Sequence, residues 1–237
     1  TGGSTAAGEI NRTLAQAAQQ AGVALGLGSM RAALEQPETV ASFQVREVAP
    51  DVLLLANLGA VQLNYGVGAA GCRRIVEMAQ ADALVLHFNA LQEAVQPEGD
   101  TDFSGLLAKV EQVCTALARD GVPVVAKEVG WGFSEETCRA LAVAGVAAID
   151  VAGAGGTSWS QVEMYRAEDE TEKKVAAAFA DWGISTAEAL RMARRGAPEI
   201  VAIASGGLRD GVEVAKCIAL GASLAGIARP FLEAAVR

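Results

Sequence analysis

The chain holds a single histidine, and it stands in a run of polar residues that could do acid–base or metal chemistry. His87 and Asn89 alternate at the end of an apolar stretch, so their side chains would point the same way along a strand. Gln92 and Glu93 follow directly. A satisfied core histidine is the structural alternative, but amide and carboxylate neighbours favour a functional site.

A lysine ends another apolar run. Lys127 would be costly to bury at the end of a strand unless an anion lies beside it. A reduced, anionic flavin is one such partner, since its charge lies near the N1–C2 edge of the ring. Asn57 ends an earlier apolar run and could donate to a ring carbonyl, or simply form a turn.

Glycine-rich turns follow two later apolar runs. Gly155-Gly156 leads to Thr157, which could reach a phosphate or ribityl hydroxyl, and to Trp159, which could wall an apolar pocket. Ser205-Gly206-Gly207 precedes a helical pattern. Backbone N–H groups of such turns, together with a helix N-terminus, bind anions. These turns therefore predict a phosphate site.

A third glycine-containing turn, Gly28-Ser29-Met30-Arg31, combines a hydroxyl with a guanidinium. Both groups suit phosphate oxygens. Ser29 could alternatively cap the helix that follows.

Seven short runs that are almost continuously apolar predict strands covered on both faces. They are Val23–Leu27, Val52–Ala56, Ala83–Phe88, Val124–Glu128, Ala147–Val151, Ile200–Ala204 and Leu224–Ala228. Helical patterns alternate with them at Ile10–Ala21, Arg73–Ala79, Leu106–Arg119, Glu135–Ala144, Ala187–Arg194 and Val212–Leu220.

This alternation predicts a parallel α/β sheet. An eighth strand just before Thr1 would complete a (β/α)8 TIM barrel, so we expect the first strand and an N-terminal segment to be missing from a single catalytic domain over residues 1–237. A doubly wound open sheet is the alternative. Polar and glycine residues after almost every strand favour the barrel, because an open sheet uses mainly its switch point.

One connection, between Gly153 and Ser185, is long and has a charged middle at Arg166–Lys174. Long loops of barrels are usually lids or binding loops. We expect its ends to be functional and its middle to be mobile, with a solvated insertion as the alternative.

The bulk composition excludes several classes. The net charge of −9, without a basic cluster, argues against a nucleic-acid partner. No apolar run is long enough for a membrane span. The four cysteines form no C-x-x-C pair and are expected to be reduced and buried, as in a cytoplasmic protein.

In their order along the chain, the motifs resemble the family of type 2 isopentenyl-diphosphate isomerases. The matching segments are Thr1-Gly2-Gly3, Gly28-Ser29-Met30-Arg31, Asn57-Leu58-Gly59, His87-Phe88-Asn89-Ala90-Leu91-Gln92-Glu93 with Pro97-Glu98-Gly99-Asp100, Lys127-Glu128-Val129-Gly130, Gly155-Gly156-Thr157, Trp182-Gly183-Ile184 and Ser205-Gly206-Gly207. The family's N-terminal basic segment and C-terminal helical extension have no counterpart in this sequence.

The resemblance implies an isomerase of isoprenoid synthesis that interconverts isopentenyl and dimethylallyl diphosphate with reduced FMN and Mg²⁺. NADPH is the expected reductant, although another reductant is possible, and a homotetramer or larger homo-oligomer is suggested. The partner is a small diphosphate.

The resemblance also implies residue roles. The expected flavin contacts are Thr1, Gly2, Ser29, Asn57, Lys127 and Thr157, and the expected FMN phosphate clamp is Gly207, Leu208, Arg209, Ala222 and Ser223. Substrate would contact Ser29, Arg31, His87, Asn89, Gln92 and Trp159. His87, Asn89 and Gln92 are the expected catalytic residues, with Gln92 as a relay or positioning group, and Glu93 the Mg²⁺ ligand.

Two other functions remain open. A 2-hydroxy acid oxidase would share the lysine strand and the phosphate clamp, but it needs a histidine base after the sixth barrel strand, where Ala154 to Trp159 holds none. A flavin- or phosphate-binding barrel without turnover would be a binding protein or scaffold.

Overall fold

The computed structural model describes residues 3–236, so the predicted flavin contacts Thr1 and Gly2 lie outside the described residues. The described residues form one parallel sheet of seven strands. The strands are β1 (Leu25–Gly26), β2 (Leu54–Gly59), β3 (Ala83–Phe88), β4 (Val124–Glu128), β5 (Ala148–Asp150), β6 (Val201–Ala204) and β7 (Leu224–Ala225).

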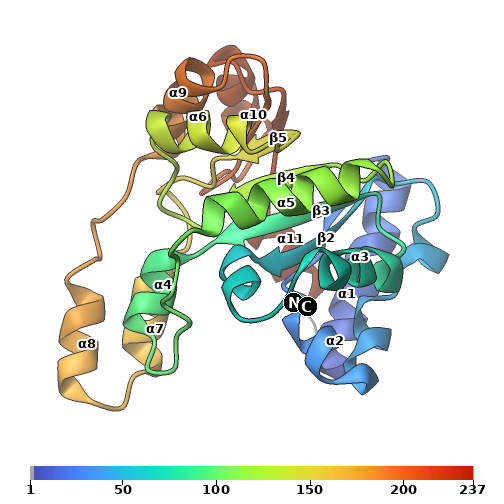
Figure 1. Ribbon diagram of the computed structural model, residues 1–237, viewed down its shortest axis with the longest axis horizontal. Helices are drawn as coiled ribbons and strands as arrows, with labels where there is room; N and C mark the ends of the chain where they lie inside the picture. Colours follow the sequence, from blue (N-terminus) through green and yellow to red (C-terminus); the bar gives the residue numbers. More distant parts are fainter. Residues whose placement is uncertain (1–2, 237) are drawn as a thin grey trace.

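The order of strands in the sheet is their order in the chain. A doubly wound sheet reverses this order at its switch point, so that alternative is wrong. The sheet curls into part of a barrel with helices on its outside, as Figure 1 shows. The predicted α/β barrel class is confirmed, and all seven predicted strands are present, several of them shorter than expected.

The six predicted helices are also present, with shorter ones between them. The α-helices are α1 (Thr5–Ala21), α2 (Arg31–Glu35), α3 (Ala69–Ala79), α4 (Ala90–Val95), α5 (Leu106–Ala118), α6 (Glu135–Val143), α7 (Trp159–Arg166), α8 (Glu170–Ala177), α9 (Thr186–Gly196), α10 (Gly211–Ala219) and α11 (Arg229–Ala235). Three 3₁₀ helices are η1 (Pro37–Phe43), η2 (Arg46–Val48) and η3 (Ala60–Asn64).

Polar side chains fix where several helices begin. Ser4 accepts the Ala7 N–H at the start of α1. Asp210 accepts two backbone N–H groups at the start of α10. Such caps satisfy donors that have no partner inside the helix. The Asp210 cap sets α10 in position directly after the Gly206-Gly207 turn.

Two apolar clusters occupy the two faces of the sheet. The large one joins the outer face to the helices and includes Leu54, Leu84 and Leu117, all fully buried. The small one lies on the opposite face and comprises Val85, Val125 and Ala148, with Leu55 and Ile203 against it. We call this second face the inner face. Because successive strand residues alternate between faces, β2 to β6 each contribute to both clusters.

The sheet of the described residues is open between β7 and β1. Leu224 of β7 is 51% exposed at this edge. Helix α11, which follows β7, contacts α1, which precedes β1, so the helices approach one another where the strands do not pair. The eighth strand expected before Thr1 lies outside the described residues and stays a prediction.

The long connection contains two helices that the sequence did not predict, and the expectation that its charged middle is mobile stays a prediction. Arg166 ends α7, and the charged residues from Glu170 onward belong to α8, whose first turn is capped by Asp169. Helices α7 and α8 pack together, and α4 contacts both. Figure 1 shows these three helices as an arm that projects from the sheet. The sequence missed them because each spans about two turns, which is too short for a clear helical period.

The four cysteines are free and buried, as predicted. Burial raises the pKa of the Cys72 thiol to about 12. Among the described residues, no helix is both long and apolar enough to cross a membrane.

Candidate functional site

A row of polar side chains lines the inner face directly beyond the small apolar cluster. Each member lies two residues after a member of that cluster, and so on the same face of its strand. The row, which we call the polar layer, comprises Asn57, His87, Lys127, Asp150 and Ser205. It sits at the carboxyl ends of β2 to β6, where barrels carry their chemistry.

Strand register holds the centre of the polar layer together. His87 is the register partner of Lys127, and Lys127 is that of Asp150. The predicted site residues His87 and Lys127 are therefore brought side by side, and a side-chain contact joins Asn57 to His87. Asp150 and Ser205 join them, although sequence reasoning gave neither a role. The two-residue offset from Ala148 and Ile203 was the signal that could have found them.

His87 is neutral at pH 7 in this environment. Burial lowers its pKa to about 4, and the positive charge of Lys127 acts in the same direction. Its Nδ1 lies 2.7 Å from Oδ1 of Asn57. Since an amide oxygen only accepts, this contact assigns the proton to Nδ1 and leaves Nε2 as an acceptor.

Asp150 supplies a negative charge close to Lys127 from within the chain. The carboxylate is buried, and its Oδ1 accepts from the Ser205 hydroxyl at 2.7 Å and from the Ala152 N–H at 3.2 Å. Burial raises the pKa of Asp150, while Lys127 and these hydrogen bonds oppose the rise. Lys127 itself donates to the carbonyl of Glu128 at 2.7 Å. Asp150 thus places within the chain a carboxylate of the kind expected beside Lys127.

The turns after β5 and β6 contact each other backbone to backbone. A Cβ on Gly206 would overlap the carbonyl of Gly153, and one on Gly207 would overlap that of Gly155. Gly206 and Gly207 also have φ of +104° and +86°, which disfavours other residues. Within the described part of the chain, the N–H groups of Gly206, Gly207 and Leu208 donate no hydrogen bond. They form a nest suited to an anion.

The rest of the predicted phosphate clamp does not lie there. Ala222 and Ser223 precede β7, which puts them at the amino edge of the sheet, opposite the nest. Their N–H groups donate to Cys217 and Ala202. The N–H of Arg209 donates to Glu213 at 2.6 Å. The predicted role of Ala222 and Ser223 in the phosphate clamp is therefore wrong. The turn that leads into a parallel strand lies at the amino edge of the sheet, whereas the nest lies at the carboxyl edge.

A second polar cluster surrounds the start of α4. Glu93 is 7% exposed, and its Oε1 accepts from Asn89 Nδ2 at 2.7 Å. Its Oε2 accepts from Gln96 Nε2 at 2.7 Å and from the Asp100 N–H at 2.8 Å. Asn89 Oδ1 is buried and has no partner among the described residues. An acceptor without a donor, next to a carboxylate, suits a cation or a donor from a ligand.

The cluster fits Mg²⁺ only if other ligands come from outside the chain. The described residues contain no group of three or more histidine, cysteine or acidic side chains that could hold a metal. Glu93 Oε1 keeps one lone pair beyond its bond from Asn89. Mg²⁺ is commonly held by one or two carboxylates together with phosphate oxygens and water. Glu93 with Asn89 Oδ1 meets that requirement when a phosphate is present.

Gln92 is held by a carboxylate that sequence reasoning missed. Its Nε2 donates to Oε1 of Glu163 at 3.2 Å. The Glu163 side chain is only 3% exposed and is paired with Arg166. Glu163 lies on α7, inside the long connection for which the sequence predicted no helix, so no periodicity marked it as facing the site.

The remaining predicted residues lie at the mouth of the site. Arg31 begins α2 and pairs with Asp100, which joins it to the Glu93 cluster. Ser29 is exposed, and Met30 rather than Ser29 occupies the cap position of α2. The capping alternative for Ser29 is thus wrong.

Thr157 is exposed on the turn after β5, and Trp159 begins α7 with 37% of its surface exposed. Neither has a contact that assigns it a role within the described residues.

Comparison with known proteins adds two findings. The family of FMN-dependent dehydrogenases matches residues 89–236. Proteins named isopentenyl-diphosphate delta-isomerase are similar over the whole chain. Those of Nostoc sp. and Synechococcus sp. are each 56% identical, over 100% and 99% of this chain, and that of Rickettsia felis is 51% identical over 99%. In each case the match covers 67% of the relative's length.

Proposed function

Because the chain belongs to the isopentenyl-diphosphate delta-isomerase family and carries an FMN-dependent dehydrogenase domain, we propose that it interconverts isopentenyl diphosphate and dimethylallyl diphosphate with reduced FMN and Mg²⁺. The observation that carries the proposal is the meeting of two groups at one edge of the sheet. The polar layer offers a cation and a neutral histidine, and the Glu93 cluster offers an unsatisfied acceptor beside a carboxylate.

The polar layer and the nest are the residues that would hold FMN. The N–H groups of Gly206 to Leu208 would bind its phosphate, replacing solvent. Lys127 and Asn57 would lie against the ring, with Thr157 beside them and Ser29 at the mouth. When bound, reduced FMN supplies an electron-rich ring that can exchange a proton with an allylic carbon.

The substrate diphosphate would lie between Arg31 and the Glu93 cluster. Arg31 offers N–H donors in a fixed plane, which suits phosphate oxygens. Glu93 and Asn89 Oδ1 would hold Mg²⁺ against the same oxygens. The cation offsets the repulsion between Glu93 and the diphosphate, so a buried carboxylate and an anionic substrate can share one site.

The polar groups around the hydrocarbon part of the substrate would position it and accept or donate protons. The reaction moves a proton between two carbons without net oxidation, so the chain must orient the allylic system and exclude water. His87 Nε2 is an acceptor at pH 7, and Gln92 is fixed by Glu163. An amide is a poor acid or base, which suits Gln92 to positioning rather than proton storage. Trp159 would wall the apolar side.

The proposal also covers the reductant, the location and the oligomeric state of the protein. We expect NADPH to reduce the flavin, and we expect a cytoplasmic homotetramer or larger homo-oligomer.

The decisive experiment incubates the protein with isopentenyl diphosphate, FMN, dithionite and Mg²⁺, and measures dimethylallyl diphosphate by NMR. We expect product only when reduced flavin and Mg²⁺ are both present. Glu93→Gln should lose activity or its dependence on Mg²⁺, whereas Glu98→Gln, which is exposed, should keep both. Equal turnover without flavin would contradict the proposal, and flavin binding without turnover would favour a binding protein instead.

The oxidase alternative lacks support from the site. Its base would be a histidine after β5, whereas the only histidine of this chain lies on β3. The turn from Ala154 to Trp159 offers no group that could replace it.

A further inference from the structure

The turn at residues 97–100, between α4 and α5, has no part in the proposed function. Its last residue, Asp100, is 16% exposed and connects three elements. Oδ2 of Asp100 accepts from Arg31 Nη1 at 2.7 Å and from Gln62 Nε2 at 2.8 Å. Its backbone N–H donates to Oε2 of Glu93 at 2.8 Å. Asp100 therefore joins α2, η3 and α4.

The turn is fixed against its neighbours on both sides. A Cβ on Gly99 would overlap the carbonyl of Glu93, so the turn lies directly on the backbone of α4. Beyond it, Asn64 Nδ2 donates to the carbonyl of Asp102 at 2.8 Å, and the Asp102 N–H donates to the Tyr65 hydroxyl at 3.1 Å. Asp100 is thus presented by a rigid support rather than by a free loop.

This support determines the orientation of Arg31. Glu35 accepts from Nε at 2.7 Å, and Asp100 accepts from Nη1. Two carboxylates on different nitrogens fix the plane of the guanidinium. Within the described part of the chain, Nη2 donates no hydrogen bond, so its two N–H groups remain available. The hydrogen bond that Arg31 donates to Glu35 and the charge of Asp100 raise the pKa of Arg31, which keeps the group charged.

We propose that Asp100 is a positioning residue that holds Arg31 in the orientation needed to bind the diphosphate, and that its turn ties this arginine to the carboxylate of Glu93. This inference rests on the proposed function and adds to it a residue that touches neither the flavin nor the reacting carbons. Planar, pre-oriented donors bind phosphate oxygens better than a mobile side chain, because less rotamer freedom is lost on binding.

The sign of the change in diphosphate affinity distinguishes a positioning role of Asp100 from a purely electrostatic one. A carboxylate close to a diphosphate repels it, so removing the negative charge of Asp100 would by itself tighten binding. Positioning predicts the opposite, because Arg31 would lose the partner that orients it. The direction of the change in affinity therefore decides between the two.

The test uses Asp100→Asn in the full chain and measures the Kd of inorganic pyrophosphate with Mg²⁺ by calorimetry. We expect pyrophosphate to bind about tenfold more weakly, which is the usual cost of one charge-assisted hydrogen bond. With isopentenyl diphosphate, KM should rise by a similar factor while kcat changes little. Asp100→Ser repeats the measurement with a smaller side chain, and thermal unfolding checks that each variant is folded.

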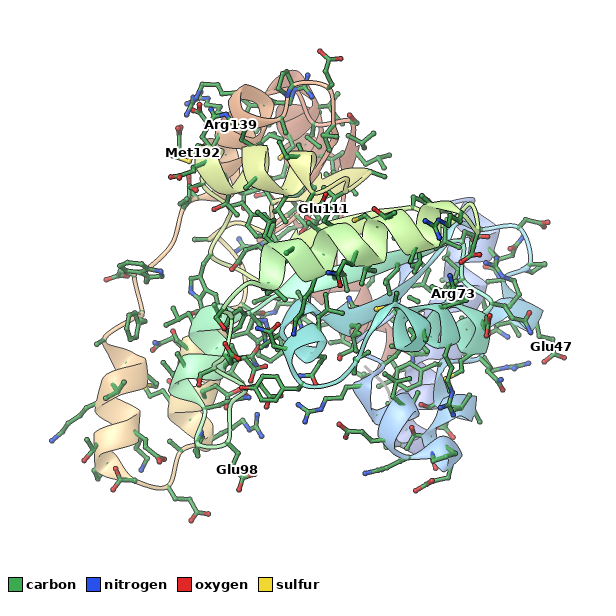
Figure 2. All side chains as sticks on the ribbon, in the orientation of Figure 1. Glu47, Arg73, Glu98, Glu111, Arg139 and Met192 are labelled. Atoms are coloured by element: carbon green, nitrogen blue, oxygen red, sulfur yellow. The ribbon has the colours of Figure 1, made fainter. Side chains whose placement is uncertain are left out.

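Two further variants serve as controls. Glu98→Gln removes the same charge from the same turn, and Figure 2 shows Glu98 pointing away from the arm, so its Kd should not change. Gln62→Met removes the other hydrogen bond to Asp100 and leaves Arg31 paired. It should weaken binding less than Asp100→Asn if positioning of Arg31 is what matters.

A double-mutant cycle completes the test. In an Arg31→Ala background, Asp100→Asn should cause no further loss of pyrophosphate affinity. Unchanged or tighter binding by Asp100→Asn alone, an equal loss in Glu98→Gln, or additive losses would each overturn the inference. If the enzyme isomerises its substrate and Asp100→Asn binds normally, only this inference fails. If Asp100→Asn weakens pyrophosphate binding through Arg31 but no isomerisation occurs, only the proposed function fails.

Discussion

At the scale of single residues, the polar layer controls protonation through burial and one neighbouring charge. His87 is kept neutral because its surroundings are poor in water and because Lys127 lies beside it. Asp150 experiences the same burial, but there Lys127 favours the charged form. One lysine thus shifts an imidazole and a carboxylate in the same direction on the pH scale, for the same electrostatic reason.

The titration of His87 can be measured directly, since the chain has one histidine. We expect its imidazole C2–H resonance to stay constant from pH 8 to well below 6.5 and to move only near pH 4. Lys127→Met should raise the pKa yet leave it below 6.5, because burial is the larger cause. A midpoint near 6.5 in the unmodified chain would show that the ring is hydrated.

The same shift affects stability. The unfolded chain takes up the proton of His87 near pH 6.5 and the folded chain only near pH 4, so the free energy of unfolding should fall as the pH falls through this interval. Asp150, whose pKa is raised, acts in the opposite direction. Urea unfolding at several pH values gives the free energy of unfolding of the unmodified chain and of His87→Gln. The difference between the two, followed across pH, is the contribution of His87.

At the scale of elements, close backbone contact positions the turns that bear the site. Gly206 and Gly207 pack on the turn after β5, and Gly99 packs on α4. In each case the contact surface is main chain, so side chains of neighbouring residues are free to point into the site. The glycines are required by this approach rather than by flexibility.

Gly99→Ala tests this requirement. The added Cβ would overlap the Glu93 carbonyl, which cannot move without disturbing α4. We expect a loss of about 1–3 kcal/mol in the free energy of unfolding, measured with urea. Gly211→Ala is the matched control, because nothing lies within 4 Å of its added Cβ, and it begins α10. If both variants lost the same stability, close packing of the turn would not be the cause.

The elements also show how far the sequence predicts the site. Strand periodicity and the polar residues at strand ends correctly placed Asn57, His87 and Lys127 at one edge of the sheet, because the carboxyl ends of parallel strands meet there. Periodicity could not place Glu163, since α7 is too short for a clear helical pattern and the sequence does not show that α7 packs on α4. The role of Ala222 and Ser223 in the phosphate clamp came from the resemblance, although the predicted strand Leu224–Ala228 already placed both residues before a strand and so at the opposite edge.

At the scale of the whole molecule, anion binding depends on a few local groups rather than on the net charge. The chain carries a net charge of −9, yet Lys127, Arg31 and the Gly206–Leu208 nest are gathered at one edge of the sheet. A ligand that bridges turns from several strands links elements that are far apart in sequence. FMN bound as proposed would do so, and its binding should therefore stabilise the fold as a whole.

Thermal unfolding with FMN tests that linkage. At a flavin concentration of 100 times Kd, binding adds about 2.7 kcal/mol, which raises Tm by roughly 5–10 °C for a chain of this size. Lys127→Gln should reduce the increase at the same FMN concentration, whereas Lys216→Gln, exposed on α10, should retain it. An increase of the same size in both variants would remove Lys127 from the flavin site.

The small apolar cluster on the inner face has a further consequence for the polar layer. Val85, Val125 and Ala148 lie one step below His87, Lys127 and Asp150, and so form the floor on which the polar layer rests. The heights of Lys127 and Asp150 above the inner face are therefore fixed by apolar packing beneath them. Replacing Ala148 with a larger apolar residue would push against this layer from below without altering any polar group.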